Sequence, residues 1–494
     1  MAFIDYSKTI VEGYLGTVAY IDDLIFSNIK EYQPKIINVE TIKEAAVTSA
    51  KKHSEPDVPP ANQQVVIQQF EPNIDPYIFT QSFCEKGIHC ALIEIKEDED
   101  DIEPIKKMLK KSDVIILDWQ MHGDNGRKAT DIVEYILRED LATLPALRLV
   151  VIYTDQLTFN DIIPTNIVPV FQGMQLTHQL SEDNLSIVAG HTKIIVVQKY
   201  TGNNGIGDMG VRVEELPDKI IREFSSMTAG LVSNAALQSI SVIRHNTHKF
   251  LGTFNKDLDA AYLAHRALLP NPEDAETHIK DLIIGSFNSI LYYSGVDETC
   301  NIEQIKLWLD SYPYADKEIK INKPANSVTI NNAERKEWLD KGYKIFTSDI
   351  LQRNGKVALT DAQFEEYDRK ELLNNANICY IPDGKSVSEA FAILTHHKSN
   401  FSSLAYEPYL TLGVLIKSAD SAEFLLCIQQ RCDSVRLLEG ETRSFLFLPF
   451  ETTDKKFSIV FKEINGTHVK LKLKGDNCHN LITRHFNPTR QGLV

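Results

Sequence analysis

The stretch DVIILDWQMHGDNG (113–126) contains a short, nearly continuous apolar run that ends in an aspartate and leads into a polar, glycine-containing loop. Four comparable runs are found nearby: GTVAYIDDLIF (16–26), IHCALIEI (88–95), LRLVVIYT (147–154) and TKIIVVQKY (192–200). All are rich in Val and Ile and do not alternate with polar residues. This pattern is typical of strands that are buried on both faces of a parallel sheet.

Helical patterns separate several of these runs. EPIKKMLKK (103–111) precedes the third run, and GRKATDIVEYILRED (126–140) follows it with apolar residues at helical spacing. Alternating strands and helices predict a doubly wound α/β domain over residues 1–210, with five parallel strands in flavodoxin-like order. Residues 27–80 and 157–191 do not fit the alternation, and we expect them to be long insertions.

The rest of the chain has a different character. The glycine-rich segment TGNNGIGDMG (201–210) predicts a linker, and residues 211–295 predict a helical connector that could dimerise. Residues 296–494 predict an α+β domain of unknown function. Its strand-like runs are FLLCIQQ (424–430), RSFLFLPF (443–450), KFSIVFKE (456–463) and HVKLKLK (468–474).

Composition narrows the functional classes. The chain has 494 residues, of which 43% are hydrophobic and 24% charged, as expected for two or three globular domains. Its formal net charge of −16 disfavours nucleic acid as a partner. The seven cysteines form no CxxC motif, and no apolar stretch is long enough to span a bilayer. We therefore expect a cytoplasmic protein that does not bind a membrane.

Polar residues stand at the ends of four predicted strands: Asp22 and Asp23 in the first run, Asp118 in the third, Thr154 in the fourth and Lys199 in the fifth. These side chains should converge, because the carboxyl ends of parallel strands meet at one edge of a sheet. Clustered carboxylates favour a hard cation such as Mg²⁺. Asp118 could then act as a nucleophile and form an acyl phosphate. Thr154 could donate a hydrogen bond to the phosphoryl group, and Lys199 could pair with its charge.

This pattern resembles the receiver domain of two-component response regulators, over about residues 14–210. In that family an acidic pair ends the first strand, the phosphoacceptor aspartate ends the third, Thr or Ser ends the fourth, and Lys ends the fifth. The loop after Asp118 also agrees, because Met121 follows three residues later and Gly126 eight residues later.

The resemblance implies that Mg²⁺ is held by Asp22, Asp23, Asp118 and the backbone carbonyl of Gln120. It also implies a partner histidine kinase, whose phosphohistidine supplies the phosphoryl group. Such a protein is a self-phosphorylating acceptor, with possible autodephosphorylation, rather than a classical turnover enzyme. The phosphate could switch an output in residues 296–494, or the protein could buffer phosphate or act as a binding scaffold that regulates another response regulator or effector.

Three positions depart from the family pattern. His122 stands where a proline is usual, Tyr200 stands where a proline commonly follows the lysine, and Val196 occupies the site of an aromatic switch residue. The phosphoacceptor chemistry matches the family, whereas the aromatic partner of its threonine switch is missing. With its long insertions, this divergent receiver resembles those of phage-defence phosphorelays of the Detocs type. This resemblance implies a role in antiviral defence.

Other interpretations of single motifs are weaker. A haloacid-dehalogenase phosphatase would need a second aspartate at position 120, where this chain has Gln120. Gly205-Ile-Gly207-Asp-Met-Gly210 fits a dinucleotide fingerprint but lacks the βαβ unit that should surround it. His245 and His248 could take part in phosphotransfer, although a connector helix is the simpler interpretation.

Cysteines near the C-terminus raise one further possibility. Cys427, Cys432, Cys478 and His479 could be drawn together as a zinc site, but their spacing is unusual for zinc and Cys427 lies in an apolar run. We therefore expect ordinary buried thiols there.

Overall fold

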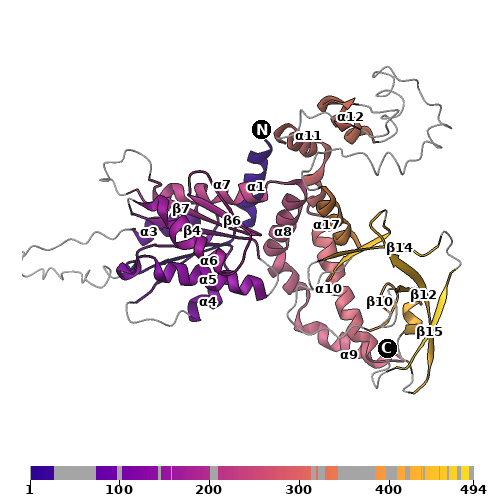
Figure 1. Ribbon diagram of the computed structural model, residues 1–494. Helices are drawn as coiled ribbons and strands as arrows, with labels where there is room; N and C mark the ends of the chain where they lie inside the picture. The colour runs from indigo at the N-terminus through magenta and orange to yellow at the C-terminus, as the bar shows by residue number, and fades with distance from the viewer. Residues whose placement is uncertain are drawn as a thin grey trace, which may run out of the picture. The chain divides into compact units, whose positions relative to one another are not determined.

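The computed structural model forms two units, Met1–Ala315 with Asn332–Phe346 and Asp316–Asn331 with Thr347–Val494 (Figure 1). The structure describes residues 2–26, 74–96, 103–142, 146–156, 158–200, 210–312, 319–320, 329–342, 384–396, 409–417, 423–434, 437, 440–455, 457–463, 467–475 and 480–488. Most of the predicted first insertion and most of the glycine-rich linker lie outside these residues.

A parallel sheet forms the centre of the first unit. Its five parallel strands are β1 (Thr17–Asp22), β2 (His89–Glu94), β3 (Val114–Leu117), β4 (Arg148–Thr154) and β7 (Thr192–Gln198). They lie in the order β2-β1-β3-β4-β7, and each neighbouring pair is parallel. The predicted flavodoxin-like arrangement is confirmed.

Two short antiparallel strands extend this sheet to seven. β5 (Gln179–Leu180) pairs with β6 (Ser186–Ala189), which pairs with β7. The five predicted parallel strands are all present, and the two additional strands come from the predicted insertion, residues 157–191. This segment also forms η3 (Phe159–Asp161), a π-helical turn (Ile163–Ile167) and α6 (Val168–Gly173), which carry the crossover from β4 to the far edge.

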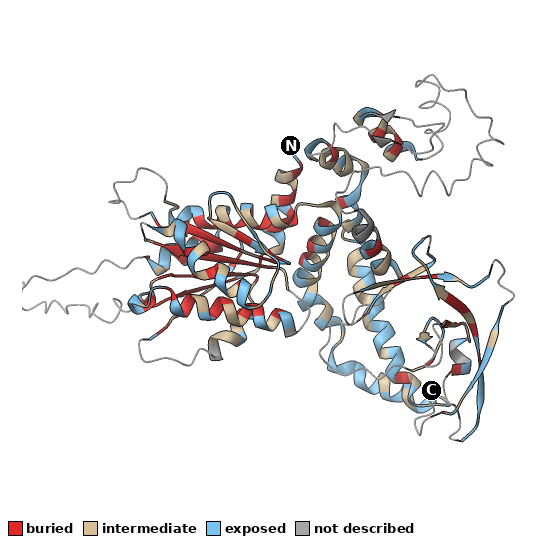
Figure 2. Ribbon diagram, viewed as in Figure 1, coloured by how far each residue is buried: buried red, intermediate tan, exposed pale blue. Residues whose placement is uncertain are grey.

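Helices cover both faces of the sheet, which explains its uninterrupted apolar strands (Figure 2). On one face, α4 (Glu103–Leu109), α5 (Arg127–Ala142) and α6 enclose an apolar core. On the other face, the core is shared with α1 (Phe3–Tyr14), α3 (Pro76–Cys84) and α7 (Leu216–Thr228). Along β3, Ile115 and Leu117 enter the first core, and Val114 and Ile116 enter the second.

Two of these helices were not expected from the sequence. α1 precedes the sheet, and α3 begins within the last residues of the predicted insertion 27–80 and ends at Cys84. The start of α3 has a local cause. The Asp75 side chain accepts hydrogen bonds from the backbone N–H groups of Tyr77 and Ile78, and Pro76 occupies the first helical turn.

Further helices complete the first unit. They are α8 (Leu231–Thr253), α9 (Asp259–Leu268), α10 (Asp274–Tyr292), α11 (Ile302–Ser311) and α12 (Asn332–Lys341), with single turns at Val213–Glu215, Lys256–Leu258 and Val296–Cys300. α8 packs along α1. Asn234 donates a hydrogen bond to the Ser7 hydroxyl, and the Ser241 hydroxyl donates to the Gly13 carbonyl. The predicted helical segment is confirmed, and it is joined to the α/β domain.

The second unit contains a six-stranded antiparallel sheet. β10 (Leu415–Lys417), β11 (Phe424–Cys427), β12 (Arg443–Thr452), β14 (His468–Leu473) and β13 (Ile459–Lys462) follow one another in space, and β15 (Ile482–Phe486) also pairs with β12. α17 (Gly384–His396) packs on β13, and its Glu389 forms ion pairs with His468 and Lys470 of β14. Two small strands, β8 (Ile319–Lys320) and β9 (Thr329–Ile330), pair separately. The predicted α+β class is confirmed.

Two smaller expectations concern membranes and cysteines. None of the described helices is both long and apolar enough to cross a bilayer. Cys427 is fully buried in an apolar cluster of the second unit. The Cys432 side chain, Cys478 and His479 lie outside the described residues.

Asp113 joins the helical region to the amino-terminal edge of the sheet. One of its carboxylate oxygens accepts hydrogen bonds from the backbone N–H groups of Gly16 and Thr17, at 3.0 and 3.1 Å. Arg244 of α8 binds both carboxylate oxygens, at 3.1 and 2.9 Å, and also donates to the Tyr14 carbonyl. The Asp113 side chain is buried and is a hydrogen-bond centre shared by the sheet and α8.

We predict that Asp113→Ala destabilises the first unit by about 2–4 kcal/mol, because two backbone N–H groups and the Arg244 guanidinium lose their shared, buried acceptor. Urea unfolding followed by tryptophan fluorescence measures this, since Trp119, Trp308 and Trp338 all lie in the first unit. Glu134→Ala removes an exposed ion pair on α5 and should change stability by less than about 1 kcal/mol. Equal effects of the two substitutions would contradict this assignment.

Candidate metal and phosphoacceptor site

The sheet brings the predicted site residues to one edge. Asp22 ends β1, Asp118 directly follows β3, Thr154 ends β4 and Lys199 directly follows β7. All of these strands are parallel, so their carboxyl ends open on the same side. Asp22, Asp118, Thr154 and Lys199 are each at least 95% buried. The predicted convergence of these strand ends therefore follows directly from the observed topology.

Three carboxylates form the centre of the site. One oxygen from each of Asp22, Asp23 and Asp118 lies within 4.8 Å of the others, the only such grouping of potential metal ligands among the described residues. Neighbouring groups fix two of the carboxylates. The Tyr20 hydroxyl and the Leu24 backbone N–H donate to Asp22, and the Gln120 backbone N–H donates to Asp118 at 2.8 Å.

Lys199 lies against the same carboxylates. Its ammonium group donates to Asp118 at 2.5 Å and approaches Asp22 at 3.4 Å. When all four groups are ionised, three negative charges and one positive charge leave a net charge of −2 at a buried position. A single divalent cation would neutralise this charge, and carboxylate oxygens are the ligands that Mg²⁺ prefers. The donor set therefore fits the implied metal.

The three aspartates of the site have pKa values that are shifted in different directions. Burial raises the pKa of Asp118 to about 6, and nearby Asp22 adds to the effect while Lys199 opposes it. Burial also raises the pKa of Asp23. For Asp22, burial is outweighed by Lys199 and the Tyr20 hydrogen bond, so its pKa is lowered. For Lys199, burial is outweighed by Asp118 and Asp22, so its pKa is raised and the ammonium form is held.

The loop after Asp118 is shaped by backbone conformation. His122 has a positive φ of 54°, and its backbone N–H donates to Asp23 at 2.5 Å. Its ring nitrogen Nε2 lies 2.7 Å from the Ile95 carbonyl. His122 thus joins the third strand end to the ends of the first two. The sequence marked it only as a departure from the family pattern, and its contacts could not be foreseen from spacing.

Other predicted residues are placed as follows. The Thr154 hydroxyl oxygen accepts a hydrogen bond from the Gln156 backbone N–H at 3.2 Å. Val196 lies in the apolar core, and Tyr200 is half-exposed beneath Arg212. The Gln120 backbone reaches Asp118 through its N–H group, while the proposed role of its carbonyl stays a prediction.

His245 and His248 are not part of this site. Both are exposed on α8, and His245 follows Arg244, which contacts Asp113 beside the amino-terminal ends of β1 and β3. The carboxylate cluster lies at the opposite ends of these strands. The structure therefore does not bring these histidines to Asp118.

Comparison with known proteins supports the same assignment. Residues 14–204 match the family model of the response receiver domain. This segment is therefore a divergent response receiver domain, in which two antiparallel strands extend the five expected parallel strands. Searches of curated proteins and of solved structures returned no match.

We predict that Gly126→Ala is far more destabilising than Gly123→Ala. Both glycines have positive φ, but a Cβ atom at Gly126 would lie 2.1 Å from the Trp119 ring, whereas at Gly123 it would meet no atom within 4 Å. We expect Gly126→Ala to lower the free energy of unfolding by about 3 kcal/mol or more, and Gly123→Ala by about 1–2 kcal/mol. Tryptophan-detected urea unfolding measures both, and similar costs would show that Trp119 does not fill this space.

We also predict that Mg²⁺ affinity falls as the pH is lowered through about 6, the pKa of the Asp118 carboxyl. Protons and the cation compete for the same oxygens, so affinity should fall by up to about tenfold per pH unit below that pKa. Mg²⁺ titration followed by Trp119 fluorescence measures the effect. Asp118→Asn should bind weakly and lose most of this pH dependence; an affinity in the wild type that does not change with pH would contradict the assignment.

Proposed function

We propose that this receiver domain accepts a phosphoryl group on Asp118 from a phosphohistidine of a partner histidine kinase, in a reaction that depends on Mg²⁺. The observation that carries the proposal is the buried cluster of three carboxylates with Lys199 bound to Asp118. Acidic clusters are common, but an ammonium group held directly on one buried carboxylate at the carboxyl edge of a parallel sheet matches a phosphoacceptor site.

Each side chain has a separate task in this proposal. One carboxylate oxygen of Asp118 attacks the phosphorus, the P–N bond to the donor imidazole breaks, and the electron pair leaves with that imidazole. The Lys199 ammonium group exchanges its ion pair with the Asp118 carboxylate for one with a phosphoryl oxygen, and Thr154 donates a hydrogen bond to another phosphoryl oxygen. Asp22, Asp23, Asp118 and the Gln120 carbonyl would hold Mg²⁺, which would neutralise negative charge on the phosphoryl oxygens.

The ionisation state of the resting site favours this chemistry. A nucleophilic carboxylate must be deprotonated, and the pKa of Asp118, about 6, allows this at neutral pH even without a cation. Lys199 keeps its proton, so it remains a positive partner for the incoming phosphoryl group. Water attack on the acyl phosphate would return the site to its starting state.

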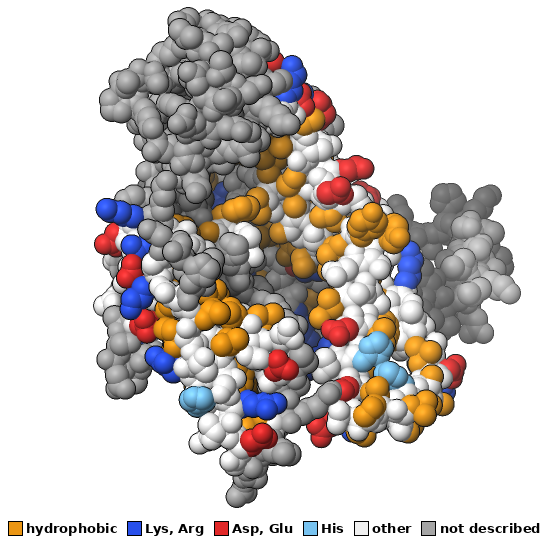
Figure 3. Space-filling view, turned by 90° about the vertical axis from the view of Figure 1, so that its right-hand side faces the viewer, with side chains coloured by type: hydrophobic (Ala, Val, Ile, Leu, Met, Phe, Trp, Pro, Cys, Tyr) orange, Lys and Arg blue, Asp and Glu red, His pale blue; other side chains and the backbone are white. Residues whose placement is uncertain are grey.

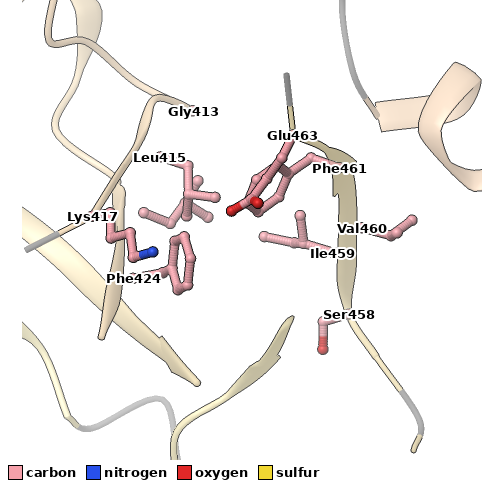
Figure 4. Close-up of a pocket in the computed structure, with 10 residues that line it drawn as sticks. Gly413, Leu415, Lys417, Phe424, Ser458, Ile459, Val460, Phe461 and Glu463 are labelled. Carbon is pink, nitrogen blue, oxygen red and sulfur yellow. The ribbon is translucent and has the colours of Figure 1, made fainter. Parts of the chain in front are cut away.

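The second unit supplies the observation that bears on the output. A cavity of about 500 Å³ lies between β10, β11 and β13 and is lined mainly by apolar side chains such as Leu415, Phe424 and Phe461 (Figure 4). Its two charged members, Lys417 and Glu463, stand on opposite sides. We propose that this unit binds a partner or ligand with an apolar surface, because most of the described side chains that line the cavity are apolar.

The alternative is a phosphate buffer or binding scaffold that restrains another response regulator. In that case, residues 296–494 would hold a partner without responding to Asp118. A kinase of a phage-defence phosphorelay is proposed as the donor on the family resemblance alone. Phosphate transfer from kinases encoded beside this protein would test that setting.

We further propose that the helices α8 to α10 act as a connector that can self-associate. Hydrophobic side chains reach the molecular surface in the view of Figure 3. In these helices the exposed apolar residues are Val232, Ile240, Leu251, Leu263, Leu268, Leu282, Ile284 and Tyr292. Exposed apolar residues on packed helices are commonly covered by further helices in a bundle.

We predict that the full chain gains the mass of one phosphoryl group when incubated with acetyl phosphate and Mg²⁺. The gain should vanish in Asp118→Asn and after chelation of Mg²⁺, because the nucleophile and the neutralising charge are then missing. Asp131→Asn on α5 is the matched control and should be phosphorylated like the wild type. Intact-protein mass spectrometry measures all four cases; no gain with acetyl phosphate or with a phosphorylated kinase would make the scaffold alternative the better account.

A further inference from the structure

Gln198, the last residue of β7, lies directly opposite Thr154, the last residue of β4. Side chains alternate between the two faces along a strand. Ile194 and Val196 enter the core beneath α5, as does Ile152, so Gln198 and Thr154 follow them onto that same face. The two polar side chains are therefore neighbours on adjacent strands, at the carboxyl edge that holds Asp118.

Both side chains are buried, but their hydrogen bonding is incomplete. Thr154 has no exposed surface and Gln198 is 5% exposed. The amide nitrogen Nε2 of Gln198 is buried with no hydrogen-bond partner among the described residues. Buried amides almost always have a partner, so an unpaired one needs an explanation. A partner that becomes available only in another state of the site would provide it.

The chain lacks the aromatic residue that partners the threonine in the family pattern, so a different side chain would have to partner Thr154. Val196 occupies the position where the family resemblance expects an aromatic ring, and it is packed in the apolar core. It has no polar group that could respond to Thr154. Lys199 projects to the opposite face, where its ammonium group binds Asp118 and Asp22. Gln198 is the polar side chain that β7 places beside Thr154.

We propose that Gln198 is a positioning residue that orients the Thr154 hydroxyl toward a phosphoryl group on Asp118. A hydroxyl has one proton to donate and two lone pairs that accept. The Gln156 backbone N–H already occupies one lone pair, at 3.2 Å. If the Gln198 amide donates to the other, the hydroxyl proton can point only away from both donors, toward the phosphoryl oxygen. This role rests on the proposed function of Asp118.

A double-mutant cycle in the full chain tests this role, with Gln198→Met, Thr154→Val and the two combined. Methionine keeps the length and volume of glutamine and removes the amide. We expect Gln198→Met to slow phosphorylation by acetyl phosphate by about three- to tenfold, the effect of one hydrogen bond. In the Thr154→Val background the same substitution should have no further effect, because the hydroxyl that it orients is gone. Mg²⁺ affinity should stay unchanged in Gln198→Met.

Three results would overturn the proposal. Rate effects that simply multiply in the double variant would show that Gln198 acts without Thr154. A clear drop in the melting temperature of unphosphorylated Gln198→Met would show that the amide is already bonded in the resting protein. A wild type that takes up no phosphoryl group from acetyl phosphate or from a kinase would remove the proposed function, and this role with it. In the first two cases the function of Asp118 would still stand.

Discussion

The contact between Lys199 and Asp118 is the interaction on which the rest of the site depends. Two groups that are almost fully buried keep opposite charges there, although burial alone opposes the charged form of each. Asp22 and Asp23 add two more carboxylates and leave the pocket with an excess of negative charge. Such an arrangement lowers the stability of the fold, because buried like charges repel one another strongly. A bound divalent cation would neutralise the carboxylates, and Lys199 would be available to pair with an incoming phosphoryl group.

The fold makes this arrangement possible by placing every participant at a strand end. Two apolar cores hold the sheet from both faces, so the strand ends are fixed while the loops beyond them remain free to carry polar groups. At the other end of the strands, Asp113 and Arg244 join α8 to the sheet. The two edges therefore have different tasks: one carries the candidate chemistry, and the other joins the sheet to the helical region.

The sequence predicted the structure well where a local pattern alone determines it. Continuous apolar runs predicted the parallel strands, and their last residues predicted the carboxylate cluster. It was less informative where tertiary contacts decide. The strands β5 and β6 are too short to show a period, and α3 follows a long segment without a recognisable pattern, although Asp75 and Pro76 carry a helix-start signal. The contacts of His122 with Asp23 and Ile95, and the unpaired amide of Gln198, depend on which strands become neighbours.

A structure of the full chain with Mg²⁺ and beryllium fluoride, a mimic of the acyl phosphate, would test the central claim most directly. Our account predicts beryllium bonded to an Asp118 oxygen, with one fluorine bound by Lys199 and another by Thr154. It also predicts Mg²⁺ held by the neighbouring carboxylates and the Gln120 carbonyl. A structure in which Lys199 stays on Asp118, and neither ion enters the cluster at saturating concentrations, would contradict the account and identify this domain as a receiver that has lost its chemistry.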